Sequence, residues 1–194
     1  FEGGIPSEPG GGTVKFVTHK DVLWNEPPLN EEAGSPNLVG AIALGESIRF
    51  LKHIGMENLY QHEKKLLKYA IKRLKEIDDI IIYGDSFNID DRVGIISFNI
   101  KDVPHELTAL ALAYEGAISV RSGCFCAQPY VQKLLNISEE EIEAYMKNED
   151  KKRPGLVRIS FGLYNTFQEV DKLIRLLKVI SRNKNYFINK YGIN

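Results

Sequence analysis

The sequence contains few cysteines, methionines or tryptophans (two, two and one in 194 residues), and neither sign of charge is in excess. Lysine and arginine total 25 against 26 aspartates and glutamates, so the formal net charge is −1. This balance argues against nucleic-acid binding, because domains that bind nucleic acids carry a basic face or a pI above ~9. No apolar run approaches the ~20 residues of a membrane-spanning helix, so no membrane partner is expected.

Two cysteines are too few for the disulfide framework of a small secreted domain. They are spaced Cys-x-Cys, at Cys124 and Cys126, which favours a reducing, cytoplasmic location. The chain opens at Phe1 in a Gly- and Pro-rich stretch that lacks the basic and apolar regions of a signal peptide. We therefore expect it to start inside a longer protein.

The pattern of apolar residues predicts an α+β domain made of helices and short strands. Apolar residues at helical spacing predict helices over 36–54, 57–77, 104–114, 139–147 and 167–181. Short β-rich runs predict strands over 13–17, 80–83, 93–100, 117–120 and 156–160. We divide the chain into the end of one domain over 1–44, a second domain over 45–181 and a polar tail over 182–194 that is expected to fray.

Helix caps support several of these boundaries. Ser35 followed by Pro36 is typical of an N-cap followed by the first helical position. Ser138 with Glu141, and Thr166 with Glu169, match the spacing of a capping box.

The loop 121–129, RSGCFCAQP, is the most unusual stretch of the sequence. A thiolate is the reactive form of cysteine, and a nearby cation such as Arg121 would lower the pKa of a thiol in this loop. The alternative is that both cysteines are small buried apolar residues. A zinc site is the weaker interpretation, because zinc takes ~4 ligands and no histidine lies nearby at ligand spacing. No metal is therefore expected.

Arg158 lies in the apolar run LVRISF, where an unpaired guanidinium would cost several kcal/mol if it were buried. Its planar fork suits a carboxylate, and the alternatives are a structural ion pair or a place on the open face of a sheet. Gly34 and Ser35 precede a predicted helix, whose N-terminus is suited to binding phosphate. Glycines 10–12 allow either close approach to a ligand or simple flexibility.

Together, these stretches resemble the cysteine desulfurases, in the class V aminotransferase-like branch of the pyridoxal-phosphate (PLP) enzymes. SVRSGCFCAQP resembles their active-site cysteine loop, and GGGTV, EAGSPN and RISFGLYNT occur in the family's order. The resemblance covers nearly the whole chain. It implies roughly the C-terminal half of a fold-type I homodimer, that is, the end of the large domain and the small C-terminal domain with its short antiparallel sheet.

The resemblance also implies roles for individual residues. Cys126 matches the cysteine that accepts sulfur as a persulfide, and Arg158 the arginine that binds the substrate carboxylate. Arg121 matches the arginine that opens the cysteine loop and is included with the substrate-binding residues. Gly34 and Ser35 match the glycine and threonine that reach the PLP phosphate of the partner subunit, with Ser in place of Thr.

The sequence departs from the family pattern in three places. The lysine that forms the Schiff base lies upstream of GGG in the family and is absent here, and His19-Lys20 falls on the wrong side of GGG. Cys124 stands where persulfide-forming relatives usually carry His or Gln, and the string GCFC also resembles the molybdenum-cofactor sulfurase branch. Residues 138–153 form an acidic insertion, which either influences the docking of a sulfur acceptor or is a solvated surface helix.

The resemblance implies that the parent enzyme removes sulfur from L-cysteine, leaving L-alanine and a persulfide for an acceptor protein, as in iron–sulfur cluster assembly. Without the lysine, this chain alone is expected to be inactive. The alternatives are another class V enzyme (an aminotransferase, a selenocysteine lyase or a molybdenum-cofactor sulfurase-like protein) and a non-catalytic domain that dimerises or docks an acceptor.

Overall fold

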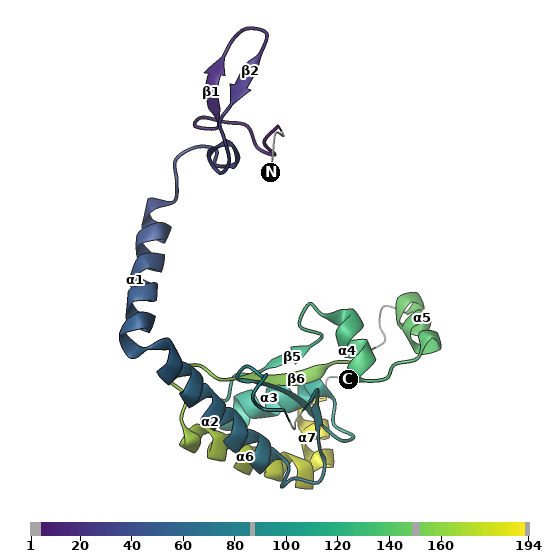
Figure 1. Cartoon of the computed structure of the whole chain (residues 1–194). Coiled ribbons are helices and arrows are strands. Elements are labelled where there is room, and N and C mark those ends of the chain that lie inside the picture. The colour runs from purple at the N-terminus through teal and green to yellow at the C-terminus, as the bar shows by residue number, and fades with distance from the viewer. Residues whose placement is uncertain (1–4, 86–87, 149–151, 193–194) are drawn as a thin grey trace. The chain divides into compact units, whose positions relative to one another are not determined.

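The computed structural model describes residues 5–85, 88–148 and 152–192, in two compact units that divide between Met56 and Glu57 (Figure 1). The sequence analysis places the domain boundary between residues 44 and 45, inside a predicted helix. In the structure this helix is α1 (Leu38–Ile54), which runs unbroken to Gly55 before the chain enters the second unit.

The first unit has little core of its own. It contains a two-stranded antiparallel sheet of β1 (Val14–Val17) and β2 (Val22–Trp24), the short 3-10 helix η1 (Leu29–Glu31), and α1. No residue of α1 is buried, although the helix is rich in apolar side chains such as Val39, which is 78% exposed. Exposed apolar surface of this extent is typical of a region that another surface covers.

The cap of α1 differs from the sequence-based prediction, which placed the N-cap at Ser35. In the structure the N-cap is Asn37, whose side-chain oxygen accepts a hydrogen bond from the Gly40 N–H at 2.9 Å. The Leu38 N–H donates to the Pro36 carbonyl at 2.8 Å. The helix therefore begins later, because Asn37 supplies a better-placed acceptor for the first turn than the Ser35 hydroxyl.

The second unit is built on a four-stranded antiparallel sheet in the order β3 (Ile80–Tyr83), β4 (Ile95–Ile100), β6 (Leu156–Ser160), β5 (Arg121–Gly123). Alternate residues of β4 are buried, as expected for a sheet with only one face covered. The strands predicted over 80–83 and 156–160 are confirmed. The strand predicted over 117–120 is wrong, because Ala117 is the left-handed C-cap of the preceding helix and pairing with β6 starts at Arg121.

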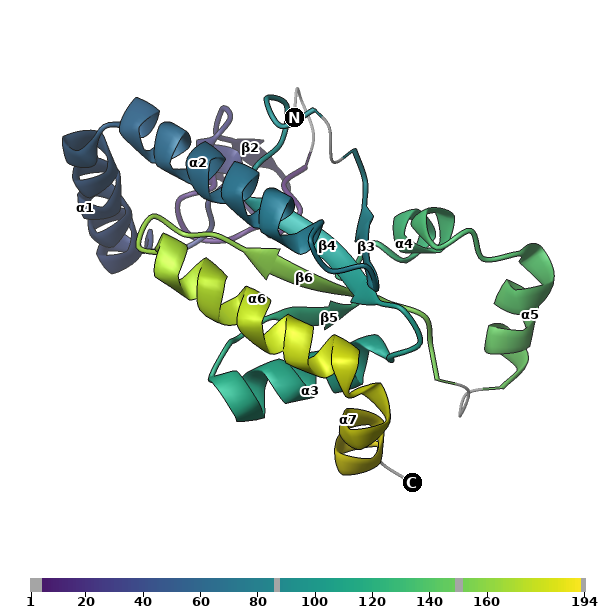
Figure 2. The same ribbon diagram turned by 90° about the horizontal axis from the view of Figure 1, so that it is seen from below.

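Helices cover one face of this sheet. In Figure 2, α2 (Met56–Leu74) and α6 (Phe167–Arg182) lie along that face. They share a continuous core with α3 (His105–Gly116) and the buried side of β4 and β6. Both predicted capping boxes are confirmed, at Ser138 and at Thr166.

Two helices were missed in the sequence. One is α4 (Gln128–Leu134). The sequence analysis includes Pro129 in a loop, but this proline lies in the first turn of α4, a position that tolerates proline. The other is α7 (Lys184–Tyr191), within the expected polar tail. There Phe187 is only 4% exposed and joins the core, so the segment is packed and not frayed. Among the described residues, no helix combines the length and apolarity needed to cross a bilayer.

Candidate functional site

Two arginines stand side by side on the open face of the sheet. Arg121 of β5 is directly opposite Arg158 of β6, and Ser97 of β4 is opposite Arg158 on its other side. Residues opposite each other in antiparallel strands point to the same face. The neighbours Val157 and Ile159 are buried in the core, so all three polar side chains lie on the face away from α2 and α6.

The Arg158 guanidinium has no acidic partner among the residues that the structure describes. Its central carbon lies 5.1 Å from the centre of the Phe125 ring, a cation–π distance. Its Nε is buried and has no hydrogen-bond partner among the described residues. Within that part of the chain, neither Arg158 nor Arg121 forms an ion pair. A structural ion pair with a described acid is therefore not the role of Arg158, and the pair of arginines is open to an external anion.

The two cysteines lie in a tight turn between β5 and α4. The Cys124 carbonyl accepts a hydrogen bond from the Ala127 N–H at 2.8 Å, and the two residues between have φ of 54° and 59°. These are Phe125 and Cys126, and positive φ is uncommon for residues with a side chain. Both thiols are free, with Cys124 half-buried and Cys126 exposed. The turn thus presents Cys126 to solvent in the same loop that places Phe125 against Arg158.

No pattern in the sequence indicated the residues that hold the segment before β6 against β5. A Cβ on Gly155 would lie 2.5 Å from His105 Nε2 and 2.7 Å from the Gly123 Cα, so only glycine allows this close approach. His105 Nε2 also lies 3.2 Å from the Arg153 carbonyl oxygen. The Asn99 amide donates to the Gly155 carbonyl at 3.0 Å. These contacts hold the approach to β6 against β5 and so position the strand that carries Arg158.

A pocket of ≈ 300 Å³ is lined in part by the cysteine loop. It lies between α4 and α5 (Glu139–Lys147), the helix of the acidic insertion. The walls are mostly apolar, and Cys124 is part of the lining. The lining residues are Cys124, Gln128, Val131, Gln132, Ile142, Tyr145, Met146, Arg153 and Pro154. The insertion therefore contributes to a cavity beside the cysteines.

Gly34 and Ser35 belong to the first unit, whereas Cys126 and both arginines lie in the second. The Gly34 N–H donates to the Gly11 carbonyl at 2.8 Å, and its φ of 80° favours glycine. Ser35 is exposed and its hydroxyl makes no hydrogen bond within the described residues. The Gly40 N–H at the start of α1 already donates to the Asn37 side chain. It is therefore not free to bind a phosphate, whereas the Ser35 hydroxyl is. That hydroxyl fits one phosphate oxygen.

His19 and Lys20 lie in the exposed turn that joins β1 to β2. The Thr18 hydroxyl accepts the Lys20 N–H at 3.1 Å and donates to the Asp21 carbonyl at 3.0 Å, so the turn is closed by its own polar groups. In the described segments, no three His, Cys, Asp or Glu side chains are grouped to bind a metal ion.

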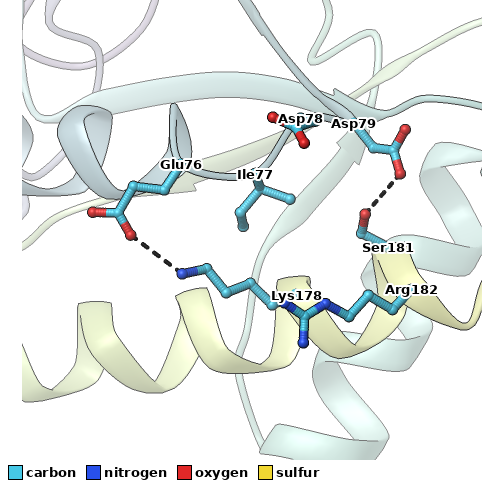
Figure 3. Close-up of a pocket in the computed structure, with 7 residues that line it drawn as sticks. All are labelled: Glu76, Ile77, Asp78, Asp79, Lys178, Ser181 and Arg182. Carbon is cyan, nitrogen blue, oxygen red and sulfur yellow. Dashed lines mark hydrogen bonds and ion pairs between the residues drawn. The ribbon is translucent and has the colours of Figure 1, made fainter.

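A second pocket, of ≈ 260 Å³, lies where the end of α2 meets α6 (Figure 3). Four of its polar side chains form two contacts: Lys178 lies 3.2 Å from Glu76, and the Ser181 hydroxyl donates to Asp79 at 2.8 Å. The Ser181 hydroxyl, followed by Lys184, holds the pKa of Asp79 below its ordinary value. This pocket contains no predicted site residue and acts as a structural contact.

The aminotransferase class-V family model matches residues 3–173. A protein of Staphylococcus aureus (strain COL) named "Probable cysteine desulfurase" is 39% identical over 174 residues, which cover 89% of this chain and 37% of that protein. A protein of the same name from Staphylococcus epidermidis (strain ATCC 35984) is 37% identical over equal shares of the two chains.

Solved structures show the same similarity. The apo cysteine desulfurase of Thermococcus onnurineus NA1 superposes with a TM-score of 0.77 at 33% identity, covering 91% of this chain and 39% of that one. The S-sulfonic acid form of the Escherichia coli cysteine desulfurase CsdA, with a TM-score of 0.72 at 23% identity, shares the fold over 90% of this chain and 38% of its own. The chain thus spans less than half the length of these relatives.

Proposed function

The chain belongs to the aminotransferase class-V family, and we propose that it is the C-terminal part of a PLP-dependent cysteine desulfurase. The enzyme would convert L-cysteine to L-alanine and leave the sulfur on Cys126 as a persulfide. The observation that carries this proposal is the pair Arg121 and Arg158 on the paired strands β5 and β6, which have no acidic partner among the described residues, together with the exposed thiol of Cys126 in the loop after β5.

The arginine pair suits the carboxylate of an amino acid. Two guanidinium groups directly opposite each other repel, and an anion between them relieves this repulsion. Arg158 already contacts the Phe125 ring, and its buried Nε has no hydrogen-bond partner in the described part of the chain. A bidentate contact to a carboxylate would satisfy the guanidinium and fix the orientation of the substrate.

The exposed position of Cys126 suits a nucleophile. Its thiolate attacks the sulfur of the bound cysteine, so an S–S bond forms while the C–S bond of the substrate breaks. The substrate carbon keeps the electron pair and takes a proton, which completes alanine. PLP, when bound, supplies the electron sink that makes this bond cleavage possible. The tight turn around Phe125 leaves the thiol on a loop that can reach both substrate and acceptor.

The first unit would contribute to cofactor binding and assembly. We assign the free Ser35 hydroxyl, with Gly34 beside it, to the phosphate of PLP in a partner subunit. The exposed apolar side chains of α1 favour a homodimer in which a second copy covers this helix. The Schiff-base lysine is not in this chain, so the chain by itself is expected to be inactive. A cytoplasmic location and a sulfur-acceptor protein complete the proposal.

The test uses the complete enzyme that contains this chain, incubated with L-cysteine and a thiol reductant. We expect alanine and sulfide in equal amounts, since the reductant releases the sulfur of the Cys126 persulfide as sulfide. Both products should be lost in the Cys126→Ser variant while PLP absorbance is retained. Alanine formation that survives Cys126→Ser would favour a class V enzyme without a cysteine nucleophile. Alanine formation absent from the wild type would exclude the proposed reaction.

A further inference from the structure

The two thiols of the turn open onto different surfaces. Cys126 is exposed in the loop next to the arginine face, whereas the half-buried Cys124 lines the ≈ 300 Å³ pocket between α4 and α5. Among the described residues that line this pocket, Cys124 supplies the thiol and Val131, Ile142 and Pro154 supply apolar wall. A half-buried cysteine in the lining of a mostly apolar pocket, two residues from a cysteine that is exposed, is unlike a pair of core cysteines.

The turn keeps the two cysteines within reach of each other. They are two residues apart, so their Cα atoms are separated by at most ~7 Å. The hydrogen bond from the Ala127 N–H to the Cys124 carbonyl closes the turn, and the positive φ of Phe125 and Cys126 folds the chain back on itself. A sulfur atom on one thiol is therefore accessible to the other without unfolding of a helix or strand.

We propose that Cys124 is a second sulfur-carrying residue, which takes the sulfane sulfur from Cys126 and holds it in the α4–α5 pocket. This inference rests on the proposed desulfurase function. The Cys124 thiolate attacks the outer sulfur of the persulfide on Cys126. A new S–S bond forms at Cys124, the S–S bond at Cys126 breaks, and Cys126 leaves as a thiolate. The proton stays on the transferred sulfur, and neither an oxidant nor a reductant is consumed.

Transfer to Cys124 would protect the sulfur from solvent and small thiols. Sulfur on Cys126 is exposed to solvent and to any small thiol, whereas sulfur on the half-buried Cys124 would lie in the pocket between α4 and α5. Transfer also returns Cys126 to its thiolate form, ready for another substrate on the arginine side. The acidic insertion thereby acquires a role as one wall of the sulfur-holding pocket, through Ile142 and its neighbours on α5.

The test follows the position of isotopically labelled sulfur in the complete enzyme after a single turnover with labelled L-cysteine. Samples are quenched by alkylation at increasing times and digested with trypsin. Cleavage after Arg121 and Lys133 yields one peptide that contains both cysteines, and fragmentation between them locates the label. We expect label first on Cys126 and later on Cys124. In Cys124→Ser the label stays on Cys126, and in Cys126→Ser neither position is labelled.

The pocket is tested with a matched pair of substitutions on neighbouring helices. Ile142→Trp reduces the pocket volume and leaves both cysteines in place. It should abolish label on Cys124 while Cys126 is still labelled. Tyr130→Trp introduces the same side chain on α4 at a position that is 60% exposed and outside the lining, so it should leave the label pattern unchanged.

The outcomes separate the two proposals. Label that leaves wild-type Cys126 without ever appearing on Cys124 would overturn the relay, and so would label on Cys124 in the Cys126→Ser variant. A wild-type enzyme that forms no alanine and carries no label would instead refute the desulfurase function itself.

Discussion

Arg121 and Arg158 stand directly opposite each other on the antiparallel strands β5 and β6, and neither has an acidic partner among the described residues. Like charges opposite each other destabilise a sheet, and the buried Nε of Arg158 lacks a hydrogen bond as well. This arrangement lowers the stability of the fold. An anion bound between the two side chains, as we propose for the substrate carboxylate, would offset that loss. The register of two short strands would then serve substrate recognition.

The first prediction concerns the carboxylate contact of Arg158. In the complete enzyme, Arg158→Ala should raise KM for L-cysteine about tenfold or more, equivalent to ~1.4 kcal/mol of binding. Arg158→Lys should restore only part of this, because an ammonium group cannot reproduce the bidentate fork. Steady-state kinetics of alanine formation provides the measurement.

A matched control for that experiment is Arg175→Ala, on the exposed side of α6, where the arginine makes no ion pair with any described residue. It should leave KM unchanged. If Arg158→Ala altered thermal stability but not KM, the arginine would be structural.

The second prediction concerns the Ser35 hydroxyl and the PLP phosphate. Ser35→Ala should weaken PLP binding to the complete dimer about tenfold or more, since hydrogen bonds to charged groups are worth ~1.5–3 kcal/mol. Fluorescence titration of the apoenzyme with PLP measures the effect. Ser47→Ala, inside the helix that follows Ser35, is the control, because the Ser47 hydroxyl donates to the Ala43 carbonyl within α1. Equal PLP affinity in the two variants would remove Ser35 from the cofactor site.

The third prediction concerns the packing of α7. Phe187 is 4% exposed and joins the core formed by α3 and α6. Phe187→Ala should therefore lower the free energy of unfolding by ~3–5 kcal/mol. Asn189→Ala, at an exposed position of the same helix, should change it by less than ~0.5 kcal/mol. Urea denaturation distinguishes the two, and similar midpoints for both variants would mean that α7 is not part of the folded core.

The fourth prediction is a pH dependence at Asp79. The Ser181 hydroxyl and Lys184 lower the pKa of this carboxyl below its ordinary value of 3.8 in the folded protein. Its ionised form therefore stabilises the fold above pH ~3.8, and this contribution is lost as pH falls through the lowered pKa. The melting temperature of Asp79→Asn should lie below that of the wild type at neutral pH and converge with it in acid. The neighbouring Asp78→Asn, at an exposed position whose carboxylate makes no ion pair within the described residues, should leave the melting temperature at neutral pH close to that of the wild type.

Local signals in the sequence located most of the secondary structure correctly. The capping boxes at Ser138 and Thr166 and the apolar spacing that follows each one identify α5 and α6. The β-branched run Ile80–Tyr83 forms β3 as predicted. These features depend on residues three or four positions apart, so they can be interpreted without knowing the rest of the fold. The α7 helix could not be found this way, because its stability comes from burying Phe187 against distant helices.

The candidate site residues could be selected from the sequence alone, because the cysteine loop, Arg158 and the Gly34-Ser35 pair are each recognisable as short motifs in chain order. How two of these motifs meet depends on the fold. Arg121 and Arg158 are 37 positions apart in the printed sequence, and only the pairing of β5 with β6 places them face to face. The tertiary structure also places Cys124 and Cys126 in different surroundings, because the walls of the Cys124 pocket come from α4, α5 and the segment before β6. Local patterns depend on neighbouring residues, whereas register and burial depend on contacts between segments that the sequence order keeps apart.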